Sequence, residues 1–75
     1  ELAEYEELIR RLYEAISSLP PMQARRVHAR YMLGMKVKDI AAMEGITPSQ
    51  AGKSIHAALR RLRRYFARQK WTVNL

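Results

Sequence analysis

"DIAAMEGITPSQAGKSIHAALRRLRRYF", residues 39–66, is the stretch that decides the fold. The glycine in its first half, Gly45, can take a positive φ without a steric penalty, so the chain can turn there within a few residues. Thr47 is a typical helix N-cap, and Pro48 suits the first helical position, where an N–H would have no partner. The stretch therefore predicts a short helix over about residues 37–44, a tight turn, and a longer helix over about residues 48–68.

The longer helix is predicted to have two different sides. Successive residues are rotated by roughly 100° along a helix. On that basis, apolar and small residues share the side that we expect to be buried: Ala51, Ser54, Ile55, Ala58, Leu59, Leu62, Tyr65 and Phe66. The opposite side collects mostly polar and basic residues: Ser49, Lys53, His56, Ala57, Arg60, Arg63, Arg64 and Ala67. This helix should pack with one side and present positive charge on the other.

Two more helices are predicted upstream. Over about residues 2–18 apolar side chains recur every three or four positions, which indicates one apolar stripe, and Pro20 and Pro21 end that helix. A second helix over about residues 21–33 should stop at Gly34, a natural C-cap. Its expected buried face consists of Ala24, Val27, Tyr31 and Met32. In the short third helix we expect Val37, Ile40 and Ala41 to face inward.

The fold class that follows is all-α, a four-helix domain with a helix-turn-helix, because no period-two alternation or hairpin turn indicates a strand. A chain of 75 residues supports one small core. We expect an acidic N-terminal helix, 1–18, packed on a helix-turn-helix domain, 19–68, with a C-terminal tail, 69–75. In that tail, Trp71, Val73 and Leu75 are expected to fold back on the core, with a contact to a partner as the less favoured alternative.

Charge is distributed unevenly along the chain, whose formal net charge is +7. Residues 1–18 hold five acidic and two basic side chains, whereas residues 19–75 hold two acidic and twelve basic ones. A basic body favours a polyanionic partner, here double-stranded DNA. No apolar run reaches the roughly 18 residues of a membrane span, so no membrane association is expected. The absence of cysteine fits a cytoplasmic protein.

The helix-turn-helix assigns a physical role to several side chains. The small Ala41 permits the two helices to cross closely, and Ile46 is placed to pack into the angle between them. The first turns of the longer helix would then enter a DNA major groove, where the candidates for contacts with bases are Ser49, Gln50 and Lys53. The candidates for contacts with phosphates are Lys36, Lys38, Thr47, His56, Arg60, Arg61 and Arg64.

At these residues the sequence resembles region four of bacterial RNA polymerase sigma factors, including short sigma-like regulators of phages and mobile elements. The matching features, in order, are Leu19-Pro20, Arg30-Tyr31 with Gly34, Ile40-Ala41, Gly45-Ile46-Thr47, and Ala58 to Arg63. The resemblance covers about residues 19–65. It implies an upstream promoter element of the minus-thirty-five type as the target, with Pro48, Ser49, Gln50 and Lys53 in the base-reading turns, and RNA polymerase as a further partner.

Two other classes of function stay open at this point. One is a protein-interaction module, in which the acidic first helix or the basic face binds RNA polymerase or another regulator. The other is the DNA-binding tail of a larger enzyme such as a recombinase, because a fold alone does not define a function. The oligomeric state does not follow from the sequence.

Enzymatic chemistry is not expected of these residues. His28 and His56 have no second ligand at a spacing that would complete a metal site, so a role as helix histidines is favoured for both. Asp39 is expected to support the start of its helix electrostatically. The sequence therefore predicts no catalytic residue, no metal and no cofactor.

Overall fold

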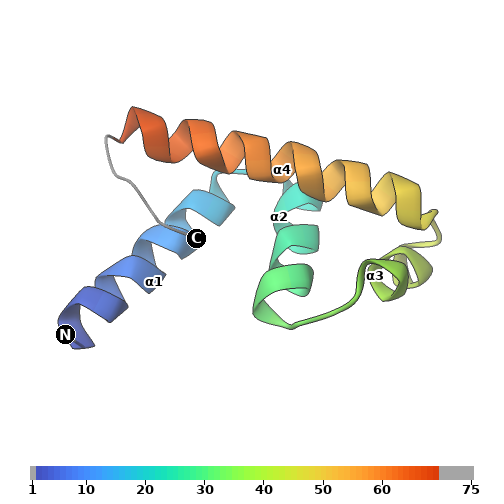
Figure 1. Ribbon diagram of the computed structural model, residues 1–75, viewed down its shortest axis with the longest axis horizontal. Helices are drawn as coiled ribbons and strands as arrows, with labels where there is room; N and C mark the ends of the chain where they lie inside the picture. Colours follow the sequence, from blue (N-terminus) through green and yellow to red (C-terminus); the bar gives the residue numbers. More distant parts are fainter. Residues whose placement is uncertain (1, 70–75) are drawn as a thin grey trace.

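Within residues 2–69, the part of the chain that the structure describes, there are four α-helices and one π-helical turn (Figure 1). The structure is a computed structural model of the chain. The elements are α1 (Leu2–Ser17), α2 (Pro21–Val27), the π-helical turn η1 (His28–Met32), α3 (Val37–Glu44) and α4 (Pro48–Arg68). The all-α prediction is confirmed. The expected return of Trp71, Val73 and Leu75 to the core lies outside the described residues.

The longest helix, α4, organises the others. It packs against both α2 and α3, and against the C-terminal part of α1 (Figure 1). The N-terminal part of α1 points away from the other helices, so α1 is supported at one end only. Accordingly, Leu2 and Tyr5 are 77% and 61% exposed, whereas Ala15 and Ile16 near the end of α1 are buried. The arrangement measures 39 × 24 × 19 Å along its principal axes.

The breaks between helices follow from local chemistry. Gly34 and Gly45 both adopt a positive φ, +71° and +69°, a conformation that favours glycine. At Gly45 the helix α3 ends in a left-handed cap, where the Ile46 N–H donates to the Ala41 carbonyl at 3.0 Å. Pro20 and Pro21 separate α1 from α2, with Pro21 in the first turn of α2. These residues end one helix and allow the next to begin in a different direction.

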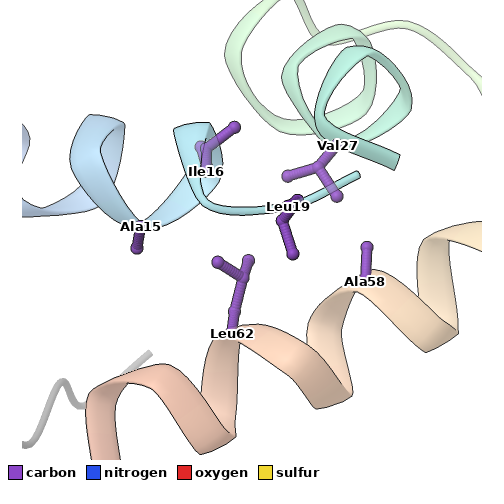
Figure 2. Packing of buried hydrophobic residues seen from close by; sticks show 6 residues of the cluster. All are labelled: Ala15, Ile16, Leu19, Val27, Ala58 and Leu62. Carbon is purple, nitrogen blue, oxygen red and sulfur yellow. The ribbon is translucent and has the colours of Figure 1, made fainter. Parts of the chain in front are cut away.

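Two groups of buried side chains hold the helices together. The larger one lies where α1, α2 and α4 meet, and its side chains converge in Figure 2: Ala15, Ile16, Leu19, Val27, Ala58 and Leu62. The smaller one belongs to α3 and the first half of α4, which pack against each other: Ile40, Ala41, Ala51 and Ile55. The helix-turn-helix half of the molecule therefore has less apolar volume at its core than the other half.

The end of the second predicted helix differs from expectation. The chain passes from α2 into a π-helical turn, in which the Leu33 N–H donates to the His28 carbonyl at 3.1 Å. A π-turn places one more residue in each hydrogen-bonded ring than an α-turn, which rotates the following side chains. Tyr31, predicted to be buried, is therefore 55% exposed, while Met32 packs against the larger core group. The prediction for Tyr31 was wrong because it assumed α-helical periodicity throughout.

Candidate nucleic-acid interface

The first turn of α4 is held by a capping box. The Thr47 hydroxyl accepts a hydrogen bond from the Gln50 N–H at 3.1 Å, and the Gln50 side-chain oxygen accepts one from the Thr47 N–H at 2.9 Å. Thr47 was predicted as the N-cap, and this is confirmed. The reciprocal bond to Gln50 was not foreseen, although Thr followed three residues later by Gln is a recognised signature of this box.

The capping box involves the side chain of Gln50, which is one of the candidates for contacts with bases. A glutamine that bridges adenine uses both its amide oxygen and its amide nitrogen. In the structure the Gln50 oxygen accepts one hydrogen bond, from the Thr47 N–H, so its second acceptor site and the amide nitrogen are what the side chain can offer to another partner while the box is intact. Ser49 and Lys53 are both exposed on the first two turns of α4. The three candidates thus lie together on one exposed helix end, and Lys53 is the one with a long charged side chain.

The basic side of α4 lies opposite its buried side, as predicted. Ala51, Ile55, Ala58 and Leu62 are buried, while the polar side is exposed apart from the half-buried Ala57. The candidates for phosphate contacts on this side, His56, Arg60 and Arg64, are exposed, and so is Arg61, which lies outside the predicted basic side. Among residues 2–69 none of the arginines of α4 forms an ion pair with a carboxylate. Their charge is therefore not neutralised by the described part of the chain.

The remaining candidates lie on the neighbouring helix and its ends. Lys36 is the N-cap residue of α3, and Lys38 lies in its first turn; both are exposed. Thr47 is also exposed, at the junction between the turn and α4. The proposed phosphate contacts are thus distributed over two helices that pack against each other, α3 and α4.

An ion pair that the sequence analysis missed connects the three helices α2, α3 and α4. The Arg26 guanidinium donates from Nε to both carboxylate oxygens of Glu44 at 3.0 Å, and from Nη2 to Glu44 Oε1 at 2.7 Å. Its Nη1 donates to the Ser54 hydroxyl at 2.7 Å. The two charged side chains are only 14% and 16% exposed. The hydrogen bonds from Arg26 lower the pKa of the Glu44 carboxyl and raise the pKa of the guanidinium.

Acidic charge on α1 is partly neutralised within that helix. Glu7 forms ion pairs with both Arg10 and Arg11, and Arg10 also reaches Glu14 at 2.9 Å. The hydrogen bond from Arg10, followed by that from Arg11, lowers the pKa of Glu7. The net negative charge of this helix is carried most openly by its first turns, where Glu4 and Glu6 are exposed.

The part of the chain that the structure describes provides no group of three or more His, Cys, Asp or Glu side chains arranged to hold a metal ion. Nor does any helix of residues 2–69 have both the length and the apolar character needed to cross a membrane.

Comparison with known families places residues 9–62 in the family "Sigma-70, region 4". The matched segment includes α2, α3, most of α4 and the second half of α1. Searches of curated proteins and of solved structures give no significant match.

Proposed function

Because this chain belongs to the sigma-70 region 4 family, we propose that it binds double-stranded DNA sequence-specifically in transcription initiation or its regulation, reading a promoter element of the minus-thirty-five type. The observation that carries the proposal is the geometry of α4. Its capped first turns present Ser49, Gln50 and Lys53, and the same helix continues into a stripe of exposed arginines without carboxylate partners in residues 2–69.

The proposed contacts divide along α4. The first turns would enter the major groove, where the Lys53 ammonium can reach the acceptors of guanine and Ser49 can bond either a donor or an acceptor. Arg60, Arg61 and Arg64 lie two to four turns farther along the helix, where they would meet phosphates. Such contacts add affinity for any sequence and make it depend on salt. Lys36, Lys38 and His56 would add to the same backbone contacts.

The test is selection of bound duplexes from a random pool, followed by binding measurements on the selected duplex and on a random one. Lys53→Ala should weaken binding to the selected duplex by roughly five- to a hundredfold and relax the preference at one base position. Arg60→Ala should weaken both duplexes about equally and reduce the salt slope by about 1. Arg10→Ala, which removes the same charge from α1, is the matched control.

The outcomes separate clearly. No enrichment in the selection would reject sequence-specific binding. Equal effects of Lys53→Ala and Arg60→Ala on the two duplexes would reject the division between base and phosphate contacts, even if the protein binds DNA.

A second candidate function is favoured by α1. Its first turns expose Leu2 and Tyr5 together with Glu4 and Glu6, on a helix end that projects away from the other helices. Aromatic and apolar side chains surrounded by charge are typical of protein interfaces. The chain would then dock through α1 on RNA polymerase or another regulator. A polymerase pull-down that the double variant Leu2→Ser, Tyr5→Ser abolishes, without a change in DNA binding, would support this function.

A further inference from the structure

We infer that Arg26 is a positioning residue for DNA recognition, which acts through Glu44 and Ser54 to set the orientation of α4 against α2 and α3. The inference rests on the proposed DNA-binding function. Arg26 does not lie on α4 and is not expected to touch DNA. Its effect is on where the first turns of α4 point.

The geometry supports a directional role. Arg26 on α2 grips the last residue of α3 through a forked set of hydrogen bonds, and its remaining terminal nitrogen reaches Ser54 on α4. Guanidinium and carboxylate groups are planar, so a forked contact fixes relative orientation as well as distance. The partners are 18 and 28 residues away from Arg26 in sequence. The Arg26 side chain thus forms hydrogen bonds that connect α2 to both α3 and α4.

Glu44 lies where local chemistry disfavours it. It is the last residue of α3, and the C-terminal end of a helix dipole disfavours negative charge. Only the turn 45–47 separates it from α4, whose first turns would enter the major groove between the phosphates of bound DNA. An uncompensated carboxylate there would repel those phosphates. The positive charge of Arg26 offsets both effects. The pair therefore makes the end of α3 compatible with a DNA backbone nearby, in addition to any contribution to stability.

The apolar packing between α3 and the first half of α4 is small, so we expect polar contacts to fix the orientation of these two helices. Its buried apolar residues are Ile40, Ala41, Ala51 and Ile55, two of which are alanines. Alanine side chains let helices approach closely but interlock little, so they constrain sliding and rotation less than large side chains do. Directional hydrogen bonds among half-buried groups provide the missing constraint.

The experiment compares the affinity for the selected duplex with that for a random duplex, in variants that are all checked for folding by circular dichroism well below their thermal midpoints. Ser54→Ala removes the bond to α4 and retains the Arg26–Glu44 pair. Glu44→Gln removes the charge of the carboxylate. Arg25→Gln, at an exposed neighbour of Arg26 on α2, is the control for a change of one unit of charge in this region.

We expect Ser54→Ala and Glu44→Gln to lower the ratio of the two affinities by at least about fivefold, the lower end of the loss of one base contact. Arg25→Gln should leave the ratio unchanged. Because alanine has a higher helix propensity than serine, the thermal midpoint of Ser54→Ala should change little. A fall in selectivity at nearly constant stability is an outcome that a merely structural role would not produce.

The inference is overturned if both variants keep the affinity ratio of the unsubstituted protein, whatever their thermal midpoints. If the unsubstituted protein itself shows no preference for any duplex, the proposed function fails, and the inference fails with it. If selectivity is normal in the unsubstituted protein and lost equally in Arg25→Gln, general charge and not orientation is responsible, which also overturns it.

Discussion

The two halves of α4 differ in composition and in how they are held. The first half, up to His56, carries one lysine and no arginine, begins with a capping box, and packs with Ala51 and Ile55 against Ile40 and Ala41 of α3. The second half carries five arginines and packs through Ala58 and Leu62 into the larger core group. One continuous helix thus joins a sparsely charged end with a capping box to a strongly basic end that packs into the larger core group.

The difference separates two requirements that a DNA-reading helix has to meet. Affinity from phosphates tolerates small displacements, because exposed arginines are long and adjustable. Recognition of bases does not, because bidentate contacts need a fixed geometry. In this chain the second half of α4 would supply affinity for DNA. The position of the first half would depend on the capping box and, as we infer, on the contacts of Arg26.

The largest effect is expected from shortening a buried side chain in the second half of α4. Leu62→Ala should destabilise the protein by about 2–5 kcal/mol, because Leu62 is buried where α1, α2 and α4 meet. Urea unfolding followed by circular dichroism measures this change. The matched control is Leu33→Ala, at a position that is 64% exposed, where a change within about 0.5 kcal/mol is expected. Similar losses in the two variants would contradict the assignment of Leu62 to the core.

A smaller effect is expected at the capped end. Thr47→Ala removes the hydroxyl that accepts the Gln50 N–H, and should cost about 1 kcal/mol of stability. Ser49→Ala, two residues away and without a capping bond in residues 2–69, is the control and should be nearly neutral. Thermal unfolding of the two variants side by side measures the difference. Equal midpoints would show that the capping box contributes no stability in solution.

Gly52 offers a change of opposite sign in the same half of α4. It lies inside the helix, its φ is not positive, and a Cβ added there would meet no atom within 4 Å. Gly52→Ala should therefore stabilise the protein by about 0.5–1 kcal/mol through helix propensity. Gly45→Ala, at φ +69°, should destabilise it. Stabilisation by both, or by neither, in urea unfolding would contradict this account of the two glycines.

The smallest expected effect is a change with pH at the Arg26–Glu44 pair, because a protonated carboxyl still accepts a hydrogen bond. Hydrogen bonding to Arg26 lowers the pKa of Glu44 in the folded protein. Its contribution to stability is thus present above the usual pKa range of glutamate and is lost as the pH falls through the lowered value. Thermal unfolding of the unsubstituted protein and of Glu44→Gln between about pH 7 and about pH 3 measures it.

The difference in stability between these two proteins should be largest near neutral pH and should shrink in acid. Glu7, whose pKa is also lowered, titrates in both proteins and therefore cancels from the comparison. A difference that stays constant over this range would show that the charge of Glu44 does not stabilise the fold.

Much of this structure could be predicted from local sequence. The bounds of α3 and α4, the left-handed turn at Gly45 and the N-cap at Thr47 were all predicted, since each depends on residues within a few positions of one another. The buried and basic sides of α4 were also predicted, because helical periodicity is local. The π-helical turn was not predicted, and neither was the exposure of Tyr31 that follows from it.

The sequence by itself determined the helices, the breaks between them and the basic side of α4, because these follow from glycine, proline, capping residues and period. Only the tertiary structure decided the relations between distant residues. Arg26 could have been one more exposed arginine, and Glu44 one more solvated carboxylate, until α2 and α3 came together and placed them within 2.7 Å of each other. Such pairing depends on how helices cross, which no local pattern encodes.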